Sequence, residues 1–192
     1  MPFDLETGKL KAKDNGPTYV GTIANYLMEQ IKVDPTVVAI CAGTPGGFGF
    51  NSEWRKAAGK QYIDVGIAEE HAIAMSSGIA KNGGKPVFNV YSTFLQRTYD
   101  QLLQDLCVNN NSAVIMNHQA SVYGMNDVTH LGFFDIPMLT SIPNLVYLAP
   151  TNNEELLAMT EYAVHQQEHP VAIRVPVGEF ISTGVADTTD YS

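Results

Sequence analysis

Short apolar runs alternate along the chain with segments whose apolar residues recur at helical spacing. The runs are of strand length and apolar at consecutive positions, which is typical of strands buried on both faces. They lie at 37–41, 62–65, 86–90, 113–116, 145–148 and 171–175. The helical patterns follow Thr18, run over 68–81 and 95–106, and follow Thr151 and Glu154, which have capping-box spacing. Alternation of this kind predicts an α/β fold with three layers, α/β/α, and a mostly parallel sheet.

Polar, turn-rich sequence flanks this pattern at both ends. Residues 1–16 are predicted to form an N-terminal arm or linker, and residues 181–192 a C-terminal linker. The folded domain is therefore expected over residues 17–180. The whole chain has 192 residues, which corresponds to about one domain of average size.

Composition narrows the possible partners. The chain has 20 acidic and 11 basic residues, a net charge of −9, which argues against nucleic acid or an anionic membrane surface as the main partner. No apolar run approaches the roughly 20 residues of a membrane span, and the N-terminus lacks a signal-peptide pattern. Cys41 and Cys107 have neither metal-ligand nor redox-pair spacing, so we expect two small buried hydrophobic residues. A cytoplasmic location is expected.

Ligands of open parallel sheets bind beyond the carboxyl ends of the strands. The segments that follow the predicted strands include 43–51, 66–71, 91–97 and 118–130. The first of these is rich in glycine but matches neither phosphate-binding glycine pattern. A conformational loop beside a site is therefore favoured over a phosphate-binding loop.

Two glutamates, Glu69 and Glu70, open the helix that follows the second strand. Acidic residues in the first turn of a helix interact favourably with the helix dipole, and this interpretation assigns them no role in binding or catalysis. The alternative is that one glutamate points inward beside Ile67 and Ala68, where its carboxyl group could share a proton with a bound ring nitrogen. His71 is read as a satisfied, partly buried histidine.

Three further residues in these segments are candidates for ligand contact. Phe94 is offset from the core-facing positions of its helix, so it either stacks on a flat ligand or belongs to the core. Arg97 either reaches a ligand anion or pairs with Asp100 or Gln101. His130 ends a long loop at the ligand edge and is a candidate proton carrier.

Taken together, three runs resemble a known family: DVGIAEEHAIA, KPVFNVYSTFLQRTYDQLLQD and THLGFFDIPMLTSIPNLVYLAP. They are similar to the pyrimidine-binding domain of 1-deoxy-D-xylulose-5-phosphate synthase, an enzyme of isoprenoid biosynthesis in the transketolase superfamily. The likeness extends over nearly the entire chain, from Pro2 to Gly178.

The resemblance implies roles for individual residues. Glu69 corresponds to the glutamate that hydrogen-bonds the aminopyrimidine of thiamine diphosphate and favours the imino tautomer, which deprotonates the thiazolium carbon. Phe94 corresponds to the aromatic residue that stacks on the pyrimidine, and His130 to the histidine that moves protons on the substrate. The implied catalytic residues are Glu69 and His130, and the implied cofactor-binding residues are Ile67, Glu69, Tyr91, Phe94 and Arg97.

The resemblance also implies that this domain is incomplete alone. The cofactor's diphosphate and its Mg²⁺ would lie on a diphosphate-binding domain or subunit, whose GDG motif is absent here; this chain would hold no metal. A homodimer is expected, with a 2-oxo acid or sugar as substrate. The implied reaction is pyruvate decarboxylation and condensation with an aldehyde. Two alternatives stay open: a subunit of a split transketolase-like enzyme with an unphosphorylated acceptor, or a non-catalytic assembly or regulatory domain.

Three positions depart from the family pattern. Gln119 and Val177 stand where the family has arginines that bind the substrate phosphate, and Asn126 replaces an active-site aspartate. Guanidinium groups bind phosphate through paired, charge-assisted hydrogen bonds. Their loss predicts weak binding of a phosphorylated acceptor.

Overall fold

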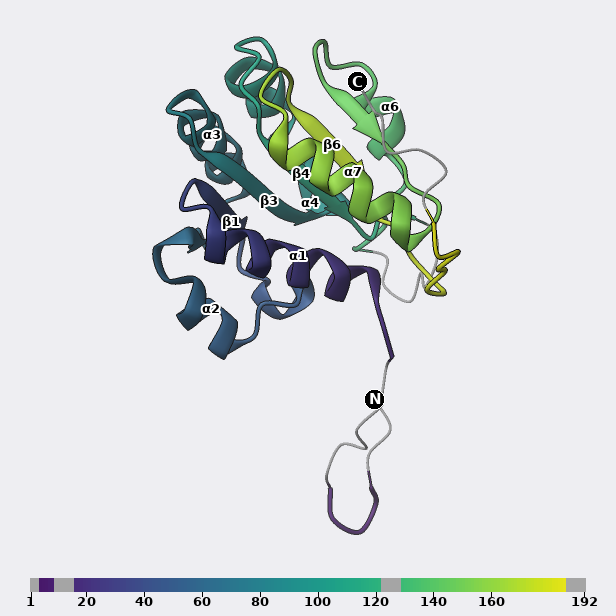
Figure 1. The fold of residues 1–192 in the computed structure, drawn as a ribbon. Helices are drawn as coiled ribbons and strands as arrows, with labels where there is room; N and C mark the ends of the chain where they lie inside the picture. Colours follow the sequence, from purple (N-terminus) through teal and green to yellow (C-terminus); the bar gives the residue numbers. More distant parts are fainter. Residues whose placement is uncertain (1–3, 9–15, 122–128, 186–192) are drawn as a thin grey trace.

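The computed structural model describes residues 4–8, 16–121 and 129–185, which form a twisted six-stranded sheet flanked by helices (Figure 1). The strands are β1 (Val37–Cys41), β2 (Tyr62–Asp64), β3 (Lys85–Tyr91), β4 (Val114–His118), β5 (Val146–Leu148) and β6 (Val171–Arg174). Their order is β2-β1-β3-β4-β6-β5, and all neighbouring pairs are parallel. This confirms the predicted parallel sheet.

Seven α-helices occur in the described residues: α1 (Tyr19–Val33), α2 (Ser52–Ala58), α3 (Glu69–Lys81), α4 (Ser92–Leu95), α5 (Tyr99–Gln101), α6 (Asp135–Leu139) and α7 (Asn153–His165). Short 3₁₀ turns span Pro45–Phe48, Gly59–Gln61 and Gln96–Thr98, and a π-helix spans Leu102–Cys107. The single helix predicted over 95–106 is therefore a broken series of turns, and α2 and α6 lie in segments for which no helix was predicted.

Alternate strand residues supply two separate cores, one on each face of the sheet. Val87 and Ile173 face the cluster that α1 and α7 cover, whereas Phe88 and Ile115 face the cluster that α3 covers. These four side chains are at most 2% exposed. Figure 1 shows α1 and α7 on one side of the sheet, and α3 on the other. The three-layer α/β/α architecture is thus confirmed.

The N-terminus of α7 lies one residue later than the sequence pattern predicted. Asn152, not Thr151, is the N-cap, and its side-chain oxygen accepts a hydrogen bond from Glu155 N at 2.9 Å. The Glu155 carboxylate accepts hydrogen bonds from the backbone N–H and the hydroxyl of Thr151, at 2.7 and 2.9 Å. Glu155 therefore reaches back past the cap in the manner of a capping box, one position beyond the predicted Glu154.

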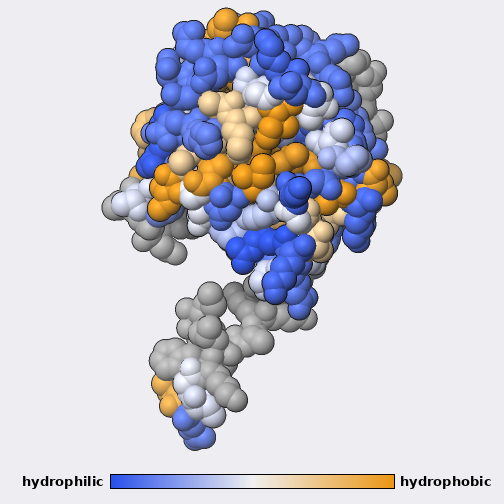
Figure 2. All heavy atoms as spheres, turned by 90° about the vertical axis from the view of Figure 1, so that its left-hand side faces the viewer, coloured by the Kyte–Doolittle hydropathy of each residue, from blue (hydrophilic) through white to orange (hydrophobic). Residues whose placement is uncertain are grey.

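One lateral face of the domain is apolar. Figure 2, viewed from the side on which α2 and α3 lie in Figure 1, shows a band of hydrophobic residues across this face. An open groove beside α3 is lined by the half-buried side chains of Val38, Met75 and Ile79. Cys41 and Cys107 are free and buried, as expected. Within the described ranges, no helix combines the length and the apolar character needed to span a membrane.

Candidate functional site

The turn between β2 and α3 places Glu69 at the carboxyl edge of the sheet. Oδ1 of Asp64 accepts hydrogen bonds from Gly43 N and Gly66 N, at 2.9 and 3.0 Å, and so joins this turn to the one that follows β1. Gly66 has a positive φ of 69°, which favours glycine. Ala68 N donates to Gly66 O at 2.8 Å, and Glu69 is the first residue of α3.

Glu69 is buried, and its carboxylate faces a cation. The residue is 2% exposed, and its Oε2 accepts a hydrogen bond from Nη1 of Arg97 at 3.3 Å. The Arg97 side chain remains 46% exposed. A carboxylate removed from water requires such a partner, because an isolated buried charge is costly. The sequence left a ligand anion, Asp100 or Gln101 as partners of Arg97; the structure pairs it with Glu69, which was not among them.

Phe94 connects this ion pair to His130. The guanidinium carbon of Arg97 lies 5.6 Å from the centroid of the Phe94 ring, within cation–π range. The His130 ring also contacts the Phe94 ring edge-on, with ring centroids 5.3 Å apart. Phe94 is half-buried and packs against the core on the α3 side. It therefore belongs partly to the core and partly to the surface of the site.

Two further aromatic residues, Tyr91 and Phe48, extend the ring contacts of Phe94. The ring centroid of Phe94 is 6.2 Å from that of Tyr91, which is in turn 5.1 Å from that of Phe48. The Tyr91 hydroxyl lies so close to Gly47 that a Cβ at this glycine would overlap it. The glycine-rich segment therefore packs on Tyr91 through Gly47. Burial raises the pKa of the Tyr91 hydroxyl.

His118 contacts Phe48 at the end of this series of rings. The sequence analysis did not identify His118 as a site residue. Its ring centroid lies 4.7 Å from that of Phe48, and its Nε2 is 3.1 Å from Oδ1 of Asn89. Burial lowers the pKa of His118 to about 3, because the charged imidazolium would be desolvated. The sequence carried part of the signal: Asn89 is a polar residue within the apolar run at 86–90, and Asn117 and His118 directly follow the run at 113–116.

Hydrogen bonds join the segment that carries His130 to α4. The hydroxyl of Thr93 donates to the carbonyl oxygen of Thr129 at 3.1 Å, and the hydroxyl of Thr129 lies 2.8 Å from Nδ1 of His130. A Cβ at Gly132 would overlap the carbonyl oxygen of Gln119. Only glycine therefore lets these two segments approach so closely.

The structure brings five of the six predicted site residues into one connected set: Glu69, Tyr91, Phe94, Arg97 and His130. Ile67 is not in contact with that set, and it is 82% exposed beside the same turn. His71 is exposed, so the prediction of a partly buried histidine is wrong. Asn126 lies outside the described residues.

Curated proteins and a family model match this sequence. The model for "Transketolase, pyrimidine binding domain" matches residues 15–181. The 1-deoxy-D-xylulose-5-phosphate synthases of Acaryochloris marina and Heliobacterium modesticaldum are 39% and 40% identical over 188 and 189 residues. That of Desulfitobacterium hafniense is 42% identical over 175 residues. These alignments cover 97%, 98% and 91% of this chain, but only 29%, 28% and 27% of the relatives.

Solved structures share the fold at lower identity. A "Split gene transketolase, inactive beta4 tetramer" has a TM-score of 0.71 at 20% identity, over 88% of this chain and 55% of that one. Transketolase from Leishmania mexicana has a TM-score of 0.69 at 15% identity, over 86% of this chain and 26% of that one.

The architecture is thus that of the transketolase-type α/β proteins. The family match extends over most of the sequence, and the chain belongs to the transketolase pyrimidine-binding domain family.

Proposed function

We propose that this chain serves as the pyrimidine-binding domain of a thiamine-diphosphate-dependent transferase of two-carbon units, most similar to 1-deoxy-D-xylulose-5-phosphate synthase. The observation that carries the proposal is the buried carboxylate of Glu69 at the carboxyl edge of the sheet, paired with Arg97 beside the Phe94 ring. The named relatives supply the activity to be tested, which is decarboxylation of pyruvate and condensation with an aldehyde.

The residues present fit an aminopyrimidine ring. Such a ring needs an apolar wall and a hydrogen-bond acceptor, and Phe94 and Glu69 provide these, with exposed Ile67 on the turn just before Glu69. Arg97 occupies Oε2 of Glu69. A carboxylate has two oxygens and about four lone-pair positions, so Glu69 can accept from a ring nitrogen while Arg97 continues to neutralise its charge.

The chemistry of the site divides between the cofactor and the chain. When bound, thiamine diphosphate supplies the electron sink that decarboxylation of a 2-oxo acid requires. Glu69 holds a proton at the ring nitrogen that it contacts, in a dry environment where a hydrogen bond of this kind is strong. His130, whose ring contacts Phe94 edge-on, moves protons on the substrate.

The geometry of the described residues corresponds to one wall of a cleft. Ile67 is 82% exposed, and Arg97 is nearly half exposed beside a buried carboxylate. We propose that a diphosphate-binding domain, on the same polypeptide or on another, covers them and contributes Mg²⁺. Within the described part of the chain, no group of three or more His, Cys, Asp or Glu side chains is placed to hold a metal ion.

The apolar lateral face supports a homodimer. The groove lined by Val38, Met75 and Ile79 is open to solvent, and the apolar band of Figure 2 crosses the face viewed from the α2 and α3 side. We propose that a second copy of the chain covers this face, since removal of exposed apolar side chains from water is favourable. Light scattering should report a dimer, and Met75→Glu should shift it to monomer; a wild-type monomer would contradict the proposal.

The function is tested by titrating thiamine diphosphate into the chain, with and without a diphosphate-binding domain, and following heat and product formation. We expect saturable binding and carboligation from pyruvate only in the mixture or in the longer protein. Glu69→Ala should abolish turnover and leave the far-UV circular dichroism spectrum unchanged. Full turnover of this variant, or of the chain alone, would contradict the proposal.

A matched variant separates loss of the site from loss of the fold. His71 lies on the same helix as Glu69 but is exposed, so His71→Ala should bind the cofactor and turn over normally. Equal loss in both variants would show that damage to α3, rather than loss of the carboxylate, explains the result.

A further inference from the structure

The carboxylate of Asp135, the first residue of α6, faces three strands of the sheet. Its Oδ2 accepts hydrogen bonds from Nε of Arg174 at 2.8 Å, from Nδ2 of Asn117 at 3.1 Å and from the hydroxyl of Tyr147. These donors belong to β6, β4 and β5, respectively. A single carboxylate oxygen therefore joins the start of α6 to three neighbouring strands.

The sheet and the surrounding burial make this contact rigid. Asp135 is 1% exposed and Asn117 is fully buried, and Asn117 and Arg174 are register partners of β4 and β6. Burial, followed by the hydrogen bond to Asp135, raises the pKa of the Tyr147 hydroxyl, which therefore remains a donor. A carboxylate removed from water is costly to separate from its cation and its other donors.

Asp135 directly follows the segment that carries His130. No helix or strand includes residues 129–134, so this segment lacks the regular backbone hydrogen bonds of those elements. Phe133 and Phe134 are 38% and 52% exposed, and burial of their rings contributes little to holding the segment. Particular contacts on either side of His130 therefore determine where its ring lies.

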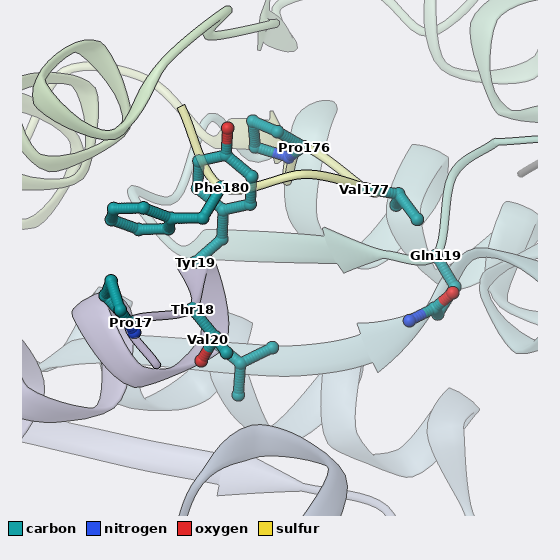
Figure 3. A pocket seen from close by; sticks show the side chains of 9 residues that line it. Pro17, Thr18, Tyr19, Val20, Gln119, Pro176, Val177 and Phe180 are labelled. Carbon is teal, nitrogen blue, oxygen red and sulfur yellow. The ribbon is translucent and has the colours of Figure 1, made fainter. Parts of the chain in front are cut away.

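On one side, the segment is held by α4 and by the turn after β4. The hydroxyl of Thr93 donates to Thr129 O at 3.1 Å, and Gly132 packs closely against the carbonyl oxygen of Gln119. The Gln119 side chain points toward the start of α1 (Figure 3), so the backbone of this residue meets Gly132. His130 lies between these two contacts along the chain.

On the other side, the segment is held by Asp135. This residue comes three positions after Gly132 and five after His130. Three residues of extended chain reach at most about 10 Å, so a displacement of Asp135 is passed to Gly132 and to the His130 ring. Leu139, which is fully buried, holds the opposite end of α6.

We propose that Asp135 is a positioning residue for His130. By fixing the end of the 129–134 segment to the sheet, its carboxylate keeps the His130 imidazole against the Phe94 ring, with centroids 5.3 Å apart. This inference rests on the proposed function, in which His130 moves protons on the substrate. A group that transfers a proton has to lie within hydrogen-bond reach of the atom that it serves, and a displacement of about 1 Å can lower a rate by about 10²-fold.

Two substitutions of Asp135 test this role in the protein assembled with its diphosphate-binding domain. Asp135→Ala removes the shared acceptor, and we expect kcat to fall at least about tenfold while KM for pyruvate changes less than about threefold, because Glu69 and Phe94 are untouched. Asp135→Asn keeps the shape and an acceptor oxygen but not the charge. It should rescue most of the loss and leave kcat about two- to fivefold below the wild type.

Val164→Ala is the control for a general loss of stability. Val164 is 1% exposed and lies in α7, in the core on the opposite face of the sheet from Asp135. The substitution should lower the melting temperature and leave kcat unchanged at temperatures where the protein is folded. An equal fall of kcat in Val164→Ala and Asp135→Ala would overturn the inference, because lost stability alone would then explain both.

Nuclear Overhauser measurements on the chain separate this inference from the proposed function. A cross-peak between the ring protons of His130 and Phe94 should be present in the wild type and in Val164→Ala. It should be lost in Asp135→Ala and weakened in Asp135→Asn. An undiminished cross-peak in Asp135→Ala, or none in the wild type, would overturn the inference whatever the activity.

The remaining outcomes are also decisive. If Asp135→Ala does not fold, Asp135→Asn replaces it, and a wild-type kcat with a full-strength cross-peak in that variant would overturn the inference. If the assembled protein shows no carboligation at all, the proposed function fails. The cross-peak then decides alone whether Asp135 places the His130 ring.

Discussion

Arg97 donates from Nη1 to Oε2 of Glu69 across 3.3 Å, so the one buried carboxylate at the proposed cofactor site is neutralised from the solvent side. The same guanidinium lies 5.6 Å from the Phe94 ring centroid. Arg97 therefore contacts both groups that are proposed to contact the pyrimidine.

Removing the charge of Glu69 while keeping its shape should separate chemistry from packing. Glu69→Gln retains an acceptor for Arg97 but cannot hold a negative charge beside the ring nitrogen. We expect turnover of the assembled enzyme to fall by about 10²–10⁴-fold, the usual contribution of a positioned acid–base group. The measurement is the steady-state kcat of Glu69→Gln relative to the wild type, and a loss below tenfold would contradict the role assigned to Glu69. The melting temperature should change little.

Removing Arg97 should destabilise the fold through Glu69. Arg97→Ala leaves a buried carboxylate without its cation, and because the arginine is nearly half exposed we expect a cost of about 1–2 kcal/mol, below that of a fully buried pair. In a Glu69→Gln background the same change should cost about 1 kcal/mol less. Urea unfolding of the four proteins measures this coupling. Additive effects would show that the two side chains do not interact in solution.

Much of the fold was predictable because its strands are buried on both faces. The runs at 37–41 and 171–175 are short and almost entirely apolar, and their alternation with helical patterns indicates a covered parallel sheet. Helix α6 was not predictable in this way. Its five residues include Pro137, which usually breaks helices but is tolerated in a first turn, where its missing N–H has no partner to lose.

The sequence predicted individual site residues, but it did not predict contacts between residues on different strands. The resemblance indicated Glu69, Phe94 and His130 one at a time from their local sequence. His118 required the strand register, since β3 and β4 place Tyr91 opposite it and Asn89 within hydrogen-bond distance of its ring. Such pairings depend on how strands align, and no spacing within a single segment contains that information.

The contact between Gly47 and Tyr91 should make this glycine intolerant of a side chain. A Cβ in Gly47→Ala would overlap the Tyr91 hydroxyl and push the ring away from Phe48. We expect a loss of about 1–3 kcal/mol in unfolding free energy, as for other overpacked sites, together with weaker cofactor binding. Tyr91→Phe removes the overlapping oxygen, so the double variant should recover most of the loss. Failure to recover would mean that the glycine is needed for another reason.

Burial of neutral His118 should make stability fall in mild acid. The pKa of His118 is about 3 in the folded chain, whereas the pKa of histidine in an unfolded chain is about 6.5. Below that value the unfolded chain binds a proton that the folded chain does not, so stability is fully present above about pH 6.5 and is lost as the pH falls toward 3.

The expected slope reaches about 1.4 kcal/mol per pH unit, or about 2 kcal/mol between pH 6.5 and 4.5. Urea unfolding at these two values should show this loss in the wild type and much less of it in His118→Gln, which can still donate to Asn89 but does not titrate. His71→Gln, a change at an exposed histidine, should retain the full pH dependence. An equal slope in His118→Gln and the wild type would show that the His118 ring is not buried as a neutral group.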